Sequence, residues 1–234
     1  MKNLTTLAPL WLLALVPALA QTAPQPRTVG SFLAIEVGNG IELRLTSGQT
    51  QRVEASADTP ELLARIKTEV RDGILKITFD REMGSFWSKK LNTRNLRVNV
   101  TAAALTGLEA TSGANVEVVG PYATDKLTLG VSSGATLRAS FTANTLQAGV
   151  SSGGVATVTG KIQRLDVHAS SGGVFKGGDL QAKACDASAS SGGTVAVGVQ
   201  ESLTAHASSG GDVRYSGSPQ VTKRTSSGGS VKGR

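Results

Sequence analysis

The sequence predicts an all-β protein: a single-stranded, right-handed parallel β-helix that starts with an N-terminal β cap. Three observations predict this fold. A Ser-Ser-Gly triplet recurs through the second half of the chain every 18 to 21 residues. Apolar and polar residues alternate around each triplet, and glycine supplies 28 of the 234 residues while aromatic residues supply only 4%. Short alternating strands with glycine at regular turns are typical of a β-solenoid.

The first twenty residues have the pattern of a secretory signal peptide. A positive Lys2 precedes an apolar run at 7–19, and an A-x-A cleavage pattern ends at Ala20. We therefore expect residues 1–20 to be removed on export, with 21–29 as a linker; an uncleaved anchor is the alternative. No later apolar run is long enough to span a membrane, so we expect no transmembrane segment in the mature chain. The exported protein would lie in the periplasm, on the outer cell surface or outside the cell.

One domain is expected over residues 30–234, and its first part, 30–106, reads as capping strands. Glycine is rarer here and charge is denser than in the rest of the chain. A short helix is expected at 59–65, with Thr59 as the N-cap and Pro60 in the first turn. A cap is needed because a bare first coil would expose an unpaired β-edge. The alternating segments predicted to be strands start at 32 and lie at 41–45, 51–55, 67–70, 74–79 and 96–100.

The second part, residues 107–234, holds seven copies of the repeat. Apolar residues recur five positions before, one position before and five positions after the first residue of a triplet, as in Leu146, Val150 and Ala156. Each unit reads as two short strands joined at a Ser-Ser-Gly corner. Because so short a unit cannot bury its apolar face alone, it must stack on its copies. The closing glycines lie at positions 113, 134, 153, 172, 192, 210 and 228.

The length of the repeat favours a parallel β-helix over related folds. A propeller blade needs about twice as many residues per repeat. A left-handed hexapeptide helix needs evenly spaced aliphatic residues, which are absent, and the usual sense of parallel crossovers favours the right-handed form. At the corners we expect glycine to permit the sharp turn and serine hydroxyls to hydrogen-bond along the stack. A row of serines that forms a binding ledge is the alternative.

The order of four features carries a family resemblance: the opening at 29–37, the hairpin at 72–77, the Ser-Ser-Gly-Gly corners and the Tyr-x-Gly-x-Pro ending at 213–219. Over about 30–234 this order resembles the putative auto-transporter adhesin head GIN domain family, a domain of unknown function in exported bacterial envelope proteins. The resemblance implies a right-handed parallel β-helix, an envelope location and an adhesive or binding role. The family carries no established catalytic residues that could be transferred to this chain.

A polar cluster is expected on the outer face, on the strands that precede the corners. Asp166 and Asp186 should be neighbours one turn apart, with His168 beside Asp166 and His206 two turns from His168. We favour a solvated surface with ordinary ion pairs. A zinc site and a catalytic pair of carboxylates are the alternatives; we expect zinc titration to show no stoichiometric binding.

A second candidate binding segment lies between two predicted strands. It places Phe86 and Trp87 beside Lys89, Lys90 and Arg94. Aromatic rings next to polar groups are suited to sugar rings and to headgroup interfaces. The segment is therefore a candidate contact for a glycan or an anionic envelope polymer. Alternatively, the two rings fold back and cover the open end of the stack.

Composition and motifs favour a protein without catalytic activity. The chain has two histidines, and its single cysteine, Cys185, is expected to be buried, a reactive or intermolecular thiol being the alternative. No nucleophile elbow, zinc-protease, P-loop or dinucleotide motif is present, and we predict no cofactor and no metal. The net charge of +7 suits an anionic envelope polymer, or serves only solubility. We expect no nucleic-acid partner, because no such motif is present.

These observations favour a secreted cell-envelope module for adhesion or surface binding. One alternative is a carbohydrate-active enzyme, a polysaccharide lyase or hydrolase that uses the face of Asp166 and Asp186. Another is a structural envelope protein with no small ligand. An enzyme needs clustered acids in a groove, whereas a binding module needs only a polar face. The sequence contains no feature that indicates the oligomeric state.

Overall fold

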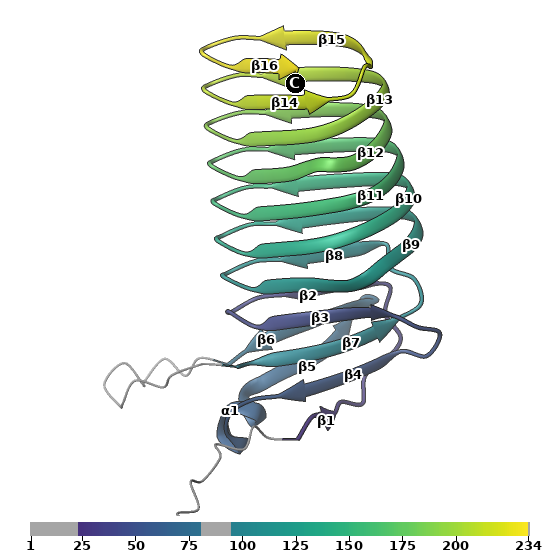
Figure 1. The fold of residues 1–234 in the computed structure, drawn as a ribbon. Helices are drawn as coiled ribbons and strands as arrows, with labels where there is room; N and C mark the ends of the chain where they lie inside the picture. The colour runs from purple at the N-terminus through teal and green to yellow at the C-terminus, as the bar shows by residue number, and fades with distance from the viewer. Residues whose placement is uncertain (1–22, 81–94, 234) are drawn as a thin grey trace, which may run out of the picture.

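The protein is an elongated stack of β-coils, a β-solenoid of about seven turns (Figure 1). This computed structural model describes residues 23–80 and 95–233, so the predicted signal peptide lies outside the described residues. All strand pairs described between residues 107 and 233 are parallel. The predicted parallel β-helix is therefore confirmed.

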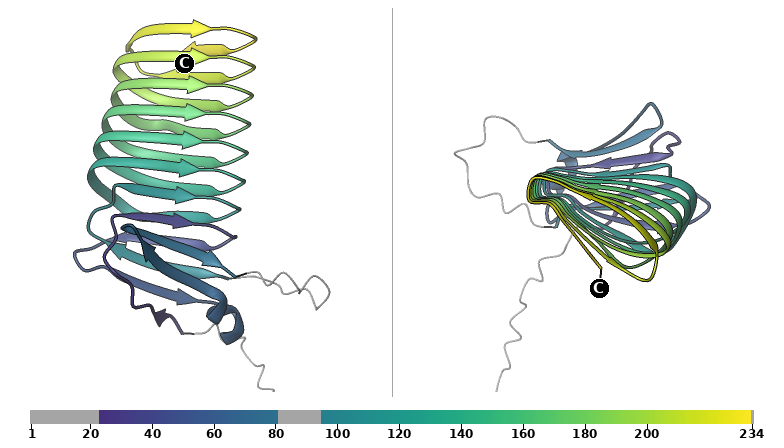
Figure 2. Two further views of the ribbon diagram at one scale, coloured as in Figure 1. Left: turned by 180° about the vertical axis from the view of Figure 1, so that it is seen from behind. Right: turned by 90° about the horizontal axis from the view of Figure 1, so that it is seen from above.

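Long strands form the middle of the stack, and each runs from one corner to the next. The sequence predicted two short strands per repeat, but pairing continues around the bend between them, with only local shifts in register (Figure 2). Glycine makes room at the bend: a Cβ on Gly160 would lie 2.1 Å from the carbonyl oxygen of Phe141. These strands are β9 (Asn115–Val131), β10 (Thr136–Val150), β11 (Val155–Ala169), β12 (Val174–Ala189) and β13 (Thr194–Ala207).

The C-terminal coils are built from shorter strands. β14 (Asp212–Ser216) is separated from β15 (Gln220–Thr225) by Gly217, Ser218 and Pro219, and β16 (Ser230–Gly233) follows the last corner. Pro219 has no N–H group to donate to a ladder, so the strand breaks at this bend. β15 and β16 lie at the end of the stack (Figure 1).

Each coil contributes to two faces, which we name by their position relative to the corner. The post-corner face holds the residues that follow each corner, and β3 (Glu42–Ser47) and β7 (Arg97–Ala102) extend it towards the N-terminus. The pre-corner face holds the residues that precede each corner. Here β2 (Ala34–Val37) and β8 (Gly107–Ala110) extend the sheet.

The N-terminal end of the stack is closed by antiparallel strands and one short helix. α1 (Pro60–Arg65) is the predicted helix, and the hydroxyl of Thr59 accepts a hydrogen bond from the Leu62 N–H at 3.3 Å. Within the described residues, no helix is long and apolar enough to cross a membrane. The antiparallel pairs join β1 (Gln25–Pro26) to β4 (Arg52–Ser56), β4 to β7, and β5 (Ile66–Arg71) to β6 (Ile74–Phe79).

The corners are tight turns that repeat along one edge of the stack. In the corner at 151–154, Ser152 and Gly153 have φ values of 49° and 72°, and the Gly154 N–H donates to the Ser151 carbonyl at 2.8 Å. Two successive residues with positive φ define the type I′ turn. The N–H of the second turn residue donates to the serine carbonyl of the next corner, as from Gly153 to Ser171 at 3.2 Å.

Backbone bonds, rather than serine hydroxyls, therefore connect most of the stacked corners. The sequence pattern instead predicted hydrogen bonds between serine hydroxyls along the stack. Among the described corner residues, the one hydroxyl bond of this kind joins Ser132 to Thr111 at 3.2 Å. One further corner, which the repeated triplet did not predict, lies at 38–41. Here Asn39 and Gly40 have φ values of 60° and 74°, and the Gly40 N–H donates to the Ser112 carbonyl.

The core consists of apolar columns that run the length of the stack. The predicted column of Leu127, Leu146, Leu165, Cys185 and Leu203 is in register and buried. Large rings fill the wider part of the coils. The buried Tyr122 packs edge-on against Phe141, with ring centroids 6.4 Å apart, and donates its hydroxyl proton to the Ala102 carbonyl at 3.0 Å.

Candidate functional site

The predicted polar cluster lies on the pre-corner face with the expected register. Asp166 pairs directly with Asp186 on the next coil. His168 pairs with Ser188, which in turn pairs with His206. The His168 Nδ1 atom lies 2.8 Å from the Ser188 hydroxyl. The structure thus brings the four predicted residues onto one face, in two adjacent columns, while their role stays a prediction.

A shallow pocket of about 330 Å³ lies between the histidine column and the corners. Its polar lining offers hydroxyl, imidazole and guanidinium groups, and it includes neither Asp166 nor Asp186. Such a lining can hydrogen-bond to a hydroxyl or anionic group but lacks the two flanking carboxylates of a glycosidase. Among the described residues, no three His, Cys, Asp or Glu side chains are grouped so that they could hold a metal ion. The pocket is lined by His168, Ser188, Ser190, His206, Ser208 and Arg224, among others.

Cys185 lies in the core beneath the two aspartates and has the properties of an apolar residue. It is 6% exposed, as the sequence predicted. Burial, followed by the charges of Asp186 and Asp166, raises the pKa of the Cys185 thiol to about 12. Because the thiolate is the reactive form, this cysteine is not a nucleophile at neutral pH.

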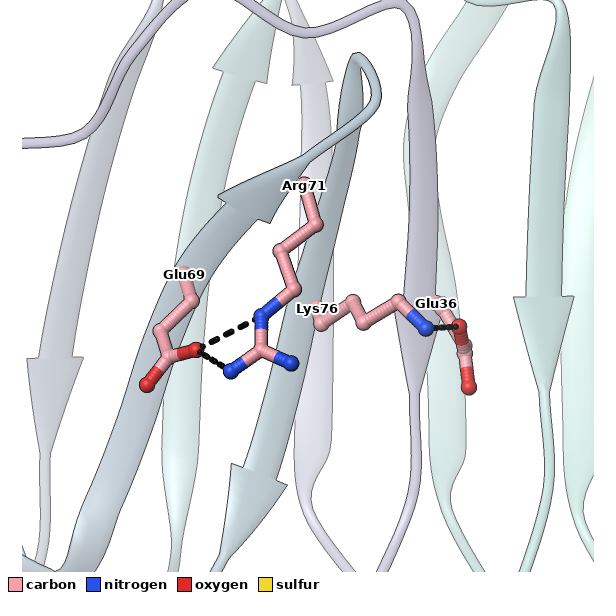
Figure 3. A network of polar contacts seen from close by, with 4 residues as sticks. All are labelled: Glu36, Glu69, Arg71 and Lys76. Carbon is pink, nitrogen blue, oxygen red and sulfur yellow. Dashed lines mark hydrogen bonds and ion pairs between the residues drawn. The ribbon is translucent and has the colours of Figure 1, made fainter.

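Near the cap, the charges of the pre-corner face neutralise one another. Glu69 accepts two bonds from Arg71, the shorter at 2.6 Å, and Lys76 lies 3.2 Å from Glu36 (Figure 3). Exposed pairs of this kind contribute about 0–1 kcal/mol each. Glu36 pairs with Glu109 on the next coil, and the same position is glycine at 130 and 149 on the two coils that follow. At this position, two coils without a side chain therefore separate these charges from His168.

The post-corner face carries a cationic column that the sequence analysis missed. The register aligns Arg138, Lys176, Arg214 and Lys232. Thr157 and Ala196 separate the first three, and Arg214 pairs directly with Lys232. We call these four cations the cation column. A signal for it exists in the sequence, because every member lies six positions after the first residue of a triplet.

A groove accompanies the cation column. It has a volume of about 400 Å³ and runs over β9 to β12. Its floor is formed by β-branched and polar residues, and the Thr136 hydroxyl donates to the Asn115 side-chain oxygen at 2.7 Å. The residues that line it include Asn115, Glu117, Thr136, Arg138, Val155, Thr157 and Lys176.

The aromatic and basic segment singled out in the sequence cannot be placed. Phe86, Trp87, Lys89, Lys90 and Arg94 all lie outside the described residues. Its proposed contact with a glycan or an anionic polymer stays a prediction.

Fold and surface together define a class of protein: a β-solenoid with polar columns and shallow grooves along two faces. The chain belongs to the family described as "Putative auto-transporter adhesin, head GIN domain", whose model matches residues 31–219. This membership confirms the resemblance seen in the sequence. Among curated proteins, none matches the chain.

Solved structures of bacterial proteins share the fold. A putative adhesin from Bacteroides fragilis is 21% identical, with a TM-score of 0.78 and coverage of 93% of this chain and 99% of that one. A putative adhesin from Parabacteroides distasonis is 18% identical, with a TM-score of 0.69 and coverage of 91% and 96%. A putative lipid binding protein from the same species is 19% identical, with a TM-score of 0.62 and coverage of 91% and 96%.

Proposed function

We propose that the protein is an exported cell-envelope module of the adhesion type, which binds an anionic polymer or glycan and does not cleave it. One observation carries this proposal. The polar side chains of both faces lie in straight columns, one residue per coil, beside shallow grooves. Such a surface matches an extended partner through many weak contacts. Membership of an adhesin family supports the same function.

The test is a binding and cleavage assay on a panel of envelope and host polymers. The protein without residues 1–20 is incubated with acidic and neutral polysaccharides, and both retention and release of new reducing ends are measured. We expect retention of at least one acidic polymer, weakened by salt, and no product. No retention of any polymer would contradict the proposed function.

Export through the N-terminal segment is part of this proposal and has its own test. The A-x-A pattern that ends at Ala20 motivates it. When the full chain is produced in a bacterial host and the cells are fractionated, the envelope or medium fraction should contain a protein that begins at Gln21. An intact N-terminus in the cytoplasmic fraction would contradict export.

A carbohydrate-active enzyme that uses Asp166 and Asp186 is the second candidate. The observation in its favour is their direct pairing, because adjacent strands lie about 4.8 Å apart. Retaining glycosidases hold two carboxyl groups about 5–5.5 Å apart. If the unmodified protein releases product and the double variant Asp166→Asn/Asp186→Asn does not, this activity replaces the binding proposal.

A further inference from the structure

We propose that the post-corner face binds a linear acidic polysaccharide lengthwise, with its carboxylates on the cation column of Arg138, Lys176, Arg214 and Lys232. This inference rests on the proposed binding function and names the surface and the ligand class. The pairing of the strands fixes the spacing of the column. Arg138 pairs with Thr157, which pairs with Lys176, so two coils separate these two cations. Lys176 and Arg214 are separated in the same way.

The spacing defines what can bind. Since each coil adds about 4.8 Å, Arg138, Lys176 and Arg214 recur roughly every 10 Å along the axis, and Lys232, which pairs directly with Arg214, lies one coil further. The coils between the first three cations carry Thr157 and Ala196, whose short side chains project less from the surface than those of the cations. An extended polymer with an anionic group at regular intervals matches this alternation. A compact ligand would meet one cation of the column, or at most the neighbours Arg214 and Lys232, of which Arg214 is already paired with Asp212.

Most cations of the column are free to bind. Among the described residues, no carboxylate lies within ion-pair distance of Arg138, Lys176 or Lys232, and all three are exposed. Arg214 is paired with Asp212 at 2.6 Å. The acid nearest to Arg138 in the column, Glu117, is already held by Arg44 at 3.2 Å. The column therefore keeps a net positive charge along its length.

The surroundings of the column favour a sugar polymer. The groove beside Arg138 and Lys176 is open along the axis and about 400 Å³ in volume. Thr136 and Thr157 offer hydroxyl groups in it, and Val155 offers an apolar patch for the face of a ring. The opposite face carries cations too, such as Lys126 and Arg164, but Asp166 and Asp186 lie beside them and repel an anionic chain. Binding should therefore be tighter on the post-corner face.

The test compares two double variants that remove the same charge at the same spacing. Arg138→Gln/Lys176→Gln removes two cations of the column. Lys126→Gln/Arg164→Gln is the matched control: both residues are exposed on the pre-corner face, and they too lie two coils apart, on either side of Thr145. The probe is polygalacturonate, with a neutral β-glucan and a DNA duplex for comparison, and affinity is measured by titration calorimetry at two salt concentrations.

We expect the unmodified protein to bind polygalacturonate more weakly at high salt. The column variant should lose roughly tenfold or more in affinity, which corresponds to about 1.4 kcal/mol, while the control variant stays within about twofold of the parent. The swap Arg138→Lys/Lys176→Arg keeps the charges and should retain binding. Both Gln variants should melt like the parent, which would show that the fold is intact.

Four outcomes would overturn the inference while leaving the proposed function standing. Equal losses in both double variants would show that net charge alone attracts the polymer. An unchanged affinity in the column variant would place the site elsewhere. Binding of the β-glucan as tight as that of polygalacturonate would exclude a charge-based site. DNA binding with the same dependence on the column would show that the column recognises polyanions and not an acidic polysaccharide. If the unmodified protein binds no polymer at all, the proposed function itself fails.

Discussion

In the corners from 151 onward, the glycine that follows the triplet has a steric role, which the addition of a single Cβ atom would test. A Cβ on Gly173 would lie 2.3 Å from the Val150 carbonyl oxygen on the preceding coil. The first two triplets are followed instead by Ala114 and Ala135, so the close approach begins at the third triplet. Glycine from position 154 onward is thus explained by contact with the neighbouring coil.

Replacing this glycine should destabilise the protein. We expect Gly173→Ala to lower the free energy of unfolding by about 1–3 kcal/mol, because the added methyl group must push two coils apart. Gly178→Ala in the same coil is the control, since a Cβ there meets nothing within 4 Å. Chemical denaturation measures both. Equal stabilities for the two variants would show that the coils separate without cost.

Cys185 should affect the pH dependence of stability. Burial, with the smaller effect of Asp186 and Asp166, raises its pKa from 9.0 to about 12. The folded protein keeps this proton where the unfolded chain loses it, so the stabilisation is complete below about pH 9 and is lost as the pH rises towards 12. We expect Cys185→Val to reduce the decline in unfolding free energy above pH 9.

Two observations would accompany this result. A thiol reagent should label Cys185 at neutral pH only after denaturation, since the side chain is buried. The raised pKa of Tyr122 is present in both proteins, so its contribution should remain in the variant. Rapid labelling of the native protein would contradict a buried thiol.

At the scale of single elements, β15 has a feature that protects the end of the stack. The inward column of Leu129, Ala148, Val167, Ala187 and Ala205 ends in Lys223 on β15. All members except Lys223 are buried, and Lys223 is exposed. A charge at the end of an apolar column opposes pairing with another β-edge.

Removing this charge should promote association. We expect Lys223→Val to form dimers or larger species at concentrations where the parent is dispersed, because the end of the stack then continues the apolar column. Arg224→Val removes a charge from the outward side of the same strand and serves as the control. Light scattering after size exclusion gives the masses. Identical masses for all three proteins would show that Lys223 does not protect the edge.

The elements also show what the sequence could and could not predict. The repeated triplet fixed the position of seven corners, and with them the register that aligns Asp166 with Asp186. The eighth corner, at 38–41, was not predicted because its turn is Asn-Gly and not Ser-Ser-Gly. In the cap, the hairpin of β5 and β6 follows from the sequence at 72–77, but the antiparallel pairs β1–β4 and β4–β7 could not be predicted, since no repeat or short turn relates those strands. The cation column was missed because outward polar positions were considered only on the strands that precede the corners, whereas its members follow them.

At the scale of the whole molecule, each coil of the stack pairs only with its neighbours. β11 pairs with β10 and β12, and the residues it aligns are equivalent positions of the repeat. Stability in such a structure is close to a sum of contributions from coils and from contacts between adjacent coils. One complete coil should therefore be dispensable.

We expect a protein that lacks residues 154–172 to fold. The deletion joins Gly153 to Gly173, which restores a complete corner and brings β10 against β12 with their apolar positions aligned. Circular dichroism should show a cooperative transition, and small-angle scattering should show a molecule shorter by about 4.8 Å. Removal of 154–163 is the control, because it cuts through a coil and should abolish folding. Loss of folding in both would contradict independent coils.

The unlike ends of the stack bear on how the chain acquires its structure. The closed end, with α1 and the antiparallel strands, is synthesised first, and the open end at β15 and β16 is synthesised last. Each new segment of about twenty residues finds its pairing surface already assembled and needs no partner from later in the chain. A polypeptide that emerges from a ribosome or a translocation pore can thus add coils to an N-terminal end that has already folded, in the order in which the coils appear.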